Sequence, residues 1–142
     1  MRLQNISDKD YKAMEDCAKK IVDQKQAFQR LILTKQEALE LFKANPFKLQ
    51  LIAGKIADDM KVTAYKCGDL IDLCTGPHIP STKMIKAFKI MKNSAAYWLG
   101  KATNDSLNRV YGISFPSKKE MDEYIHLKEE AERRDHRLIG KQ

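Results

Sequence analysis

The segment 61–74, which reads KVTAYKCGDLIDLC, constrains the fold of this chain more than any other. β-Branched and aromatic residues lead into a Cys-Gly-Asp turn, and a second apolar run follows, which is the pattern of a β-hairpin. Alternation along the second strand puts Asp72 and Cys74 on one face and Ile71 and Leu73 on the other. We therefore expect an antiparallel hairpin from which Asp72 and Cys74 point the same way.

The first two helices of the chain are predicted by their starting residues. One follows a capping-box-like start at Ser7, and its apolar residues recur at helical spacing. Cys17 is one of these residues, so we expect it in the core. A strand over 28–33 then leads to Thr34, which caps the second helix with Glu37 three positions later.

Two more helices are predicted from the same kind of signal. Asn45 and the proline after it suit the cap and first turn of one helix, with Gly54 as its stop. The other begins at Ser117, where Glu120 completes the capping box, and is almost wholly charged over 128–137. Such a charged end is typical of a connector to another part of a protein.

The order of elements predicts the fold class. Between the hairpin and the last helix, segments 85–91, 95–98 and 109–115 have β-compatible composition, with a polar break at 92–94 between the first two. A helix, a strand, two helices, several strands and a last helix indicate an α+β fold with a mainly antiparallel sheet, flanking helices and a long charged C-terminal helix. A length of 142 residues suits one folded domain.

Charge and cysteine usage narrow the class of protein. Lysine and arginine total 26 against 19 acidic residues, which gives a formal charge of +7 and favours a polyanionic partner such as RNA. The apolar runs are far shorter than the roughly 20 residues that span a membrane, and no secretory signal follows Met1. Three cysteines in an irregular arrangement favour a reducing compartment, so we expect a soluble cytoplasmic protein with no membrane partner.

Cys74 and His78 are four positions apart, and a Gly-Pro step between them can fold the histidine back toward Asp72. A thiolate and an imidazole both bind zinc, but a structural site needs four ligands and a catalytic site commonly three with water. The pair could also do acid–base or nucleophilic chemistry, with Asp72 orienting the imidazole or holding a water molecule. A third interpretation is a buried cysteine at a strand end and a turn histidine bonded to the backbone.

Several lysines and aromatic residues also have two interpretations. A lysine is most often a solvated surface residue, and an aromatic residue in a strand is most often in the core. The functional interpretation is a groove for an RNA backbone or a tRNA 3′ end, with aromatic rings as stacking partners. The residues concerned are Lys48, Lys86, Lys89, Lys92 and Lys101, with Tyr65, Tyr97 and Trp98.

Five segments, taken in order, carry a resemblance to a known family. They read NPFKLQLI, CGDLIDLCTGPHIPS, IKAFKIMKNSAAYWLGK, NRVYGISFPS and RDHRLIGKQ. Together they resemble the editing region of threonyl-tRNA synthetases and the linker into the aminoacylation domain. Alanyl-tRNA synthetases share a related Cys-x-x-x-His half, but the wording Leu-Cys-Thr-Gly-Pro-His is that of the threonyl branch. The resemblance implies an editing-domain portion over 1–116, whose first half lies upstream, and a helix and linker over 117–142.

The resemblance also implies roles for individual residues. Carried over by motif, Cys74 and His78 are the second half of an editing site, with Lys48 and Asp72 beside the ester and the ribose of the terminal adenosine. The family's first half, a His-x-x-x-His pair, does not occur in this sequence. We therefore expect a fragment that is inactive by itself. The residues predicted to contact tRNA are Lys48, Lys86, Lys89 and Tyr97.

The implied reaction is hydrolysis of the ester that joins serine to threonine-specific tRNA. Serine and threonine differ by one methyl group, which is worth only about 1–3 kcal/mol in a binding pocket, so a second hydrolytic site adds fidelity. Water is the implied nucleophile, and Cys74 as a covalent nucleophile is the less favoured variant.

Cofactors and partners follow from the same resemblance. Cys74 and His78 could contribute to a zinc site, but a metal-free mechanism is expected, with zinc and ATP confined to the aminoacylation domain. The implied partners are the acceptor end of threonine-specific tRNA and the other domains of a homodimeric parent enzyme. Two alternatives stay open, namely a non-catalytic basic module that docks the tRNA acceptor end and a free-standing deacylase.

Overall fold

The computed structural model describes residues 5–140, and their contacts gather in two compact units. One unit is Gln24–Thr82, and the other comprises the described residues up to Asp23 together with those from Lys83 onward. Where the length predicts one folded unit, two form because the segment 24–82 closes on itself. The Gln26 N–H donates to Thr82 Oγ1 at 2.9 Å, and the Thr82 N–H donates to Gln26 O at 2.9 Å.

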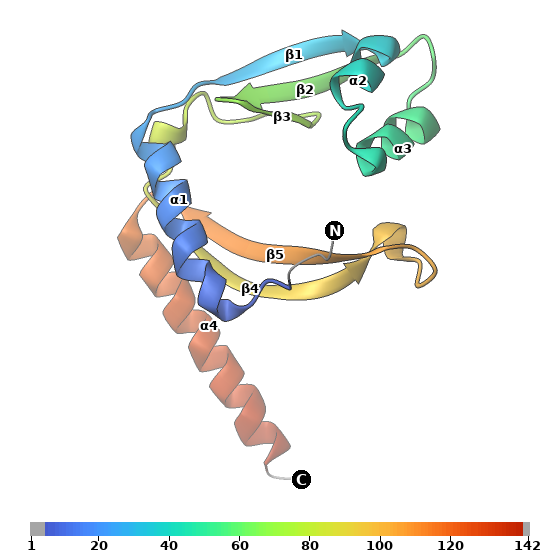
Figure 1. Cartoon of the computed structure of the whole chain (residues 1–142). Helices are drawn as coiled ribbons and strands as arrows, with labels where there is room; N and C mark the ends of the chain where they lie inside the picture. Colours follow the sequence, from blue (N-terminus) through green and yellow to red (C-terminus); the bar gives the residue numbers. More distant parts are fainter. Residues whose placement is uncertain (1–4, 141–142) are drawn as a thin grey trace. The chain divides into compact units, whose positions relative to one another are not determined.

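The unit Gln24–Thr82 is a three-stranded antiparallel sheet covered by two helices (Figure 1). Its strands are β1 (Phe28–Thr34), β2 (Lys61–Cys67) and β3 (Leu70–Leu73), in the order β1-β2-β3, and its helices are α2 (Lys35–Leu41) and α3 (Pro46–Lys55). The core consists of Ala38, Phe42, Ile52, Val62 and Ala64. Since these residues come from both helices and from β2, α2 and α3 cover one face of the sheet.

The predicted hairpin is confirmed, with the predicted faces. β2 and β3 pair antiparallel, and Ile71 and Leu73 pack against the core, whereas Asp72 is exposed. Because side chains alternate along a strand, Asp72 lies on the face away from α2 and α3.

The predicted helix starts in this unit are also confirmed. The Thr34 hydroxyl accepts the Glu37 N–H at 3.1 Å, and Asn45 Oδ1 accepts two N–H groups at the start of α3. The predicted stop at Gly54 is wrong by one residue, because α3 continues to Lys55 and the Ile56 N–H still donates to Ile52 O at 3.2 Å. Ile56 packs against the core, which explains why the chain stays helical up to it.

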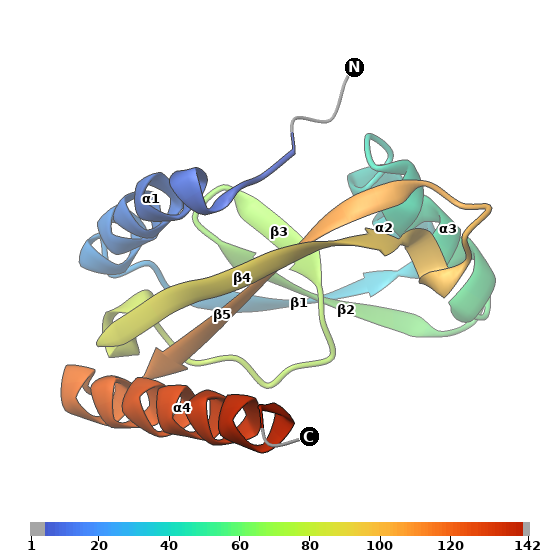
Figure 2. The same ribbon diagram turned by 90° about the horizontal axis from the view of Figure 1, so that it is seen from below.

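The other unit is built on a two-stranded antiparallel ribbon of β4 (Ala87–Tyr97) and β5 (Ser106–Phe115). Figure 2 shows these strands side by side, with α1 (Tyr11–Asp23) and α4 (Lys118–Ile139) as separate helices. The Tyr11 hydroxyl donates to Asn93 Oδ1 at 2.5 Å and joins α1 to β4. The rings of Phe115 and Tyr124 join β5 to α4, with centroids 5.4 Å apart. Short 3₁₀ turns are η1 (Asp8–Asp10), η2 (Thr82–Met84) and η3 (Trp98–Gly100).

Two predictions for this unit are wrong. The polar break predicted at 92–94 is absent, because these residues pair with β5 and β4 is one continuous strand. Cys17 is exposed and not in the core. The narrow ribbon offers α1 little surface to pack against, and α1 has no buried residue.

The fold class is confirmed as α+β with antiparallel sheets and a long C-terminal helix. Ser117 caps that helix as predicted, because its hydroxyl accepts the Glu120 N–H at 3.2 Å. The division at 116/117 between an editing portion and a linker concerns function and stays a prediction.

Candidate functional site

The open face of the three-stranded sheet carries the chemically distinctive residues of the unit Gln24–Thr82. Arg30 pairs with Tyr65, and Tyr65 pairs with Asp72, so the three form one row across the sheet. Residues directly opposite each other in an antiparallel pair share a face. Since Asp72 lies away from the core, the Tyr65 side chain lies on the open face beside it.

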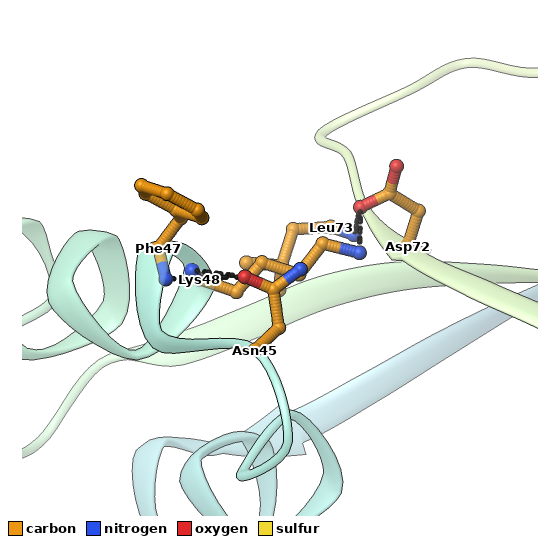
Figure 3. A network of polar contacts seen from close by, with 5 residues as sticks. All are labelled: Asn45, Phe47, Lys48, Asp72 and Leu73. Atoms are coloured by element: carbon orange, nitrogen blue, oxygen red, sulfur yellow. Dashed lines mark hydrogen bonds and ion pairs between the residues drawn. The ribbon is translucent and has the colours of Figure 1, made fainter. Parts of the chain in front are cut away.

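Lys48 and Asp72 form an ion pair that joins α3 to β3. Lys48 Nζ lies 2.9 Å from Asp72 Oδ1, and Figure 3 shows the two side chains reaching toward each other. The Lys48 ammonium also lies 5.0 Å from the centroid of the Phe42 ring. The Lys48 side chain is 24% exposed and that of Asp72 is 58% exposed, so the pair borders the solvent. The structure therefore brings together two of the predicted site residues.

The start of α3 explains how Lys48 is positioned. Asn45 Oδ1 accepts the N–H groups of Phe47 and Lys48, at 3.1 and 3.2 Å, which fixes the first turn (Figure 3). A cation there is disfavoured by the helix dipole. The carboxylate of Asp72 compensates this, and its Oδ1 also accepts the Leu73 N–H at 2.8 Å.

Cys74 is half-buried just after β3 and is held by its backbone. Its N–H donates to Thr63 O at 3.2 Å, which continues the sheet for one residue beyond the strand. Its Sγ accepts the Gly76 N–H at 3.3 Å. Gly76 has φ 76° and precedes Pro77 through a cis peptide bond. The thiol is thus oriented by the turn that leads to His78.

His78 is exposed but held by two aromatic rings. Its imidazole stacks on Tyr65, with centroids 3.9 Å apart and planes 4° apart, and meets the Phe28 ring edge-on at 5.3 Å. A Cβ at Gly76 would overlap the Tyr65 hydroxyl, so the turn and this ring fit closely. Tyr65 therefore supports both the loop and His78, a role that the sequence indicated only by an aromatic residue in a strand.

Asp72 and His78 have separate partners in this structure. Asp72 contacts Lys48 and Leu73, while the ring contacts of His78 are with Tyr65 and Phe28. No hydrogen bond from Asp72 orients the imidazole within residues 5–140, and none joins Cys74 to His78. What the described chain presents is a Lys48–Asp72 ion pair and a His78 imidazole stacked on Tyr65, the cross-strand partner of Asp72.

Comparison with known proteins shows which family the sequence of this chain resembles. Residues 62–111 match the family described as the threonyl and alanyl tRNA synthetase second additional domain. The cytoplasmic threonine–tRNA ligase of Saccharomyces cerevisiae is 52% identical over 137 residues, which are 96% of this chain and 19% of that protein. The threonine–tRNA ligase of Chlamydia trachomatis is 45% identical over 137 residues, or 96% of this chain and 21% of that protein. The chain belongs to the threonyl-tRNA synthetase family.

The probable cytoplasmic threonine–tRNA ligase 1 of Dictyostelium discoideum extends the comparison, with 53% identity over 136 residues. The chain spans about a fifth of the length of these relatives, 19% in the Dictyostelium protein. The family match runs from β2 into the first part of β5 and includes Asp72, Cys74 and His78. Lys48 lies outside the matched residues of the domain but within the similarity to the synthetases.

The donor set of this synthetase segment does not make a zinc site by itself. Within the described residues no group of three or more histidine, cysteine, aspartate or glutamate side chains could hold a metal ion. Cys74 and His78 supply two donors, whereas a catalytic zinc commonly takes three protein ligands. No helix among residues 5–140 is long and apolar enough to cross a membrane.

The other predicted tRNA contacts of this synthetase segment lie in the ribbon unit. Lys86, Lys89 and Tyr97 are exposed, just before or within β4, and Tyr97 is 52% exposed. Lys48 belongs to the unit Gln24–Thr82. The predicted chemical residues and the predicted ribbon contacts are therefore supplied by different units.

Proposed function

We propose that the chain is part of the editing site of a threonine–tRNA ligase, where it contributes to hydrolysis of serine from threonine-specific tRNA. The observation that carries the proposal is the Lys48–Asp72 pair at 2.9 Å, in which Asp72 shares a sheet face with Tyr65, the residue on which the His78 ring stacks. Family membership supports the same conclusion. The tRNA, the other synthetase domains, a homodimeric ligase that uses ATP and a cytoplasmic location belong to the proposal.

Lys48 and Asp72 hold the substrate in this mechanism. The Lys48 ammonium is held by the helix cap at Asn45 and by the carboxylate of Asp72. It stabilises the negative charge that develops on the carbonyl oxygen of the ester when water attacks. Both contacts of Asp72 use Oδ1, so Oδ2 can accept a hydrogen bond from a ribose hydroxyl of the terminal adenosine. The ion pair therefore orients the acyl ester and does not take a proton.

His78 and Cys74 act on the attacking water. An imidazole changes charge near neutral pH and can accept a proton from water as the ester carbonyl is attacked. The stack on Tyr65 fixes the plane of the ring and leaves its nitrogens facing outward from that stack. The Cys74 thiol, on the same loop, helps to position that water molecule. The His-x-x-x-His pair of the family supplies further contacts to water.

The decisive experiment is deacylation of serine-charged, threonine-specific tRNA by a threonine–tRNA ligase that contains this chain and the family's His-x-x-x-His half. Cys74→Ala and His78→Ala should each lower the rate, by about 10²–10⁴-fold where proton transfer is lost. Cys17→Ala is the matched control, because this cysteine is exposed in the other unit. An unchanged rate for both site variants, with folding retained, would show that the site assignment is wrong.

The Lys48–Asp72 pair gives a second arm of the same experiment. Lys48→Gln and Asp72→Asn should slow hydrolysis strongly and change stability little, because a solvent-bordering ion pair contributes only about 0–1 kcal/mol to stability. If tRNA binding persists in every variant and no hydrolysis depends on these residues, the chain is a non-catalytic module that docks the tRNA acceptor end.

A further inference from the structure

The segment 81–116, which contains both strands of the ribbon, carries a strongly one-sided set of charges. Between Pro80 and Ser117 the cations are Lys83, Lys86, Lys89, Lys92, Lys101 and Arg109, and the only acidic residue of that segment is Asp105. Lys89, Lys92 and Arg109 are exposed, and the ion pairs of the described residues do not include them. The strands β4 and β5 themselves contain no carboxylate.

A β-bulge gathers these cations on one face. Lys89 and Lys92 are three positions apart, which in a regular strand would put them on opposite faces. The register shifts between Ile90 and Lys92, so Lys89 pairs with Ile113 and Lys92 pairs with Tyr111. Ile113 and Tyr111 share a face of β5, and Lys89 and Lys92 therefore share it as well. A bulge is a known means of re-aiming side chains.

The bulge is held by a contact from α1. The Ile90 N–H, at the register shift, donates to Glu15 Oε1 at 2.9 Å. This carboxylate is engaged with the backbone and comes from the helix that packs on Asn93, whose side chain alternates away from Lys92. Glu15 therefore stabilises the bulge, and none of the ion pairs among residues 5–140 joins it to these cations.

Polar side chains order the same face beyond the bulge. Ser94 pairs with Arg109, one step along from the pair of Lys92 and Tyr111. Lys92 Nζ lies 4.7 Å from the Tyr111 ring centroid. Hydrogen bonds from Ser94 and then Arg109, with the charges of Arg109 and Lys92, hold the pKa of the Tyr111 phenol below its usual value. Lys92 and Arg109 are therefore both ordered by contacts with the Tyr111 side chain.

We propose that this surface, the basic face of Lys89, Lys92, Ser94, Arg109 and Tyr111, binds successive phosphates of an RNA backbone. The inference rests on the proposed function and extends it, because it assigns to the ribbon the contact that holds the tRNA acceptor arm. Lysine and arginine bind phosphate by charge, while hydroxyl groups donate hydrogen bonds to its oxygens.

The geometry favours a line of separate anions over a single bound ion. Residues two apart on one strand are about 6.6 Å apart, which is comparable with the separation of neighbouring phosphates along one nucleic-acid strand. Cations that are already ordered by Tyr111 lose less side-chain freedom on binding. Backbone contacts of this kind position an RNA without reading its sequence. Tyr97 pairs with Ser106 and lies on the opposite face, so it takes no part in this surface.

The test measures binding of this chain to a fluorescently labelled, threonine-specific tRNA transcript at several salt concentrations. Lys92→Gln with Arg109→Gln should weaken binding and reduce the slope of log K against log salt by about 2, because each phosphate contact contributes about 1. Lys19→Gln with Lys20→Gln removes the same charge from exposed positions on α1 and should change the slope by less than half as much. Tyr111→Phe should weaken binding slightly.

Equal slopes of log K against log salt for the two double variants would overturn the proposal. It would also be overturned if Lys92→Gln with Arg109→Gln weakened binding to polyglutamate as much as binding to tRNA. All substituted side chains are exposed, and circular dichroism verifies that each variant folds. The proposed function is tested separately by ester hydrolysis in the full synthetase. There the basic-face variant should raise KM for seryl-tRNA and leave kcat unchanged. If hydrolysis did not depend on Cys74 but the increase in KM were still seen, only the proposed editing role of the site would be refuted.

Discussion

The two units of this chain are stabilised in different ways. In Gln24–Thr82 a sheet and two helices close around a core of five buried residues. In the described part of the other unit, Ala87 is the single buried hydrophobic residue. A closed core holds side chains on its surface in fixed relation, as the 2.9 Å pair of Lys48 and Asp72 illustrates. A long ribbon presents a row of charges instead. In our proposals, ester hydrolysis belongs to the unit with the closed core and RNA binding belongs to the ribbon unit.

The largest expected effect is on the core. Ile52→Ala should destabilise the unit Gln24–Thr82 by about 2–5 kcal/mol, because Ile52 is only 1% exposed and its removal leaves a cavity. Ile113→Ala in the half-buried ribbon should have a smaller effect. Urea unfolding checks this with two probes, circular dichroism and the fluorescence of Trp98, the single tryptophan, which belongs to the ribbon unit. If Ile52→Ala moves the Trp98 transition as far as the circular dichroism transition, the units do not unfold separately.

Gly76→Ala should follow in size. The substitution forces a side chain into a left-handed conformation, which costs roughly 1–2 kcal/mol, and its Cβ would also displace the Tyr65 ring that supports His78. Gly100→Ala is a matched control, because Gly100 has φ 70° but open space around the added atom. Stability and seryl-tRNA hydrolysis should both fall further for Gly76→Ala. Equal effects of the two variants would mean that the contact with Tyr65 is unimportant.

Removal of one helix cap from each unit gives a smaller effect. Asn45→Ala should cost about 0.5–2 kcal/mol, since its side chain accepts two N–H groups and α3 packs on the core. Ser117→Ala should cost less, because its hydroxyl accepts one N–H and most of α4 is exposed. Urea midpoints rank the two variants. The reverse order would contradict the view that a cap contributes more where its helix packs on a core.

The smallest expected effect depends on pH. Hydrogen bonds from the side chain and backbone of Thr34 lower the pKa of the Glu37 carboxyl in the folded chain. The charged form is therefore favoured by folding, and its stabilising contribution is present above the unfolded pKa and lost as the pH falls through the folded pKa. Glu37→Gln should lower the urea midpoint at neutral pH and make no difference once the pH is below the folded pKa of Glu37. A deficit that persists in acid would show that the amide disturbs the cap sterically.

Local features of the fold could be predicted from the sequence. Caps at Thr34, Asn45 and Ser117 depend on residues three or fewer positions away, and the hairpin faces follow from simple alternation. The bulge that aligns Lys89 with Lys92 could not be predicted, because the register depends on β5 and on a carboxylate from α1.

The candidate site was predictable only in part. Lys48 and Asp72 came from a family resemblance, and their contact required α3 and β3 to be placed in space. The role of Tyr65 depends on how the turn after Cys74 returns His78 to the sheet, which alternation alone does not describe. The exposure of Cys17 was missed because helical spacing predicts an apolar side but not whether another element covers it.

The hydrogen bond between Asp72 and Leu73 has a consequence for solubility. β3 is an edge strand, and an unpaired edge N–H is a point where a strand of another molecule can add and start aggregation. The Asp72 carboxylate occupies the Leu73 N–H at 2.8 Å and places negative charge along that edge. The side chain that pairs with Lys48 therefore also protects the sheet from intermolecular strand pairing.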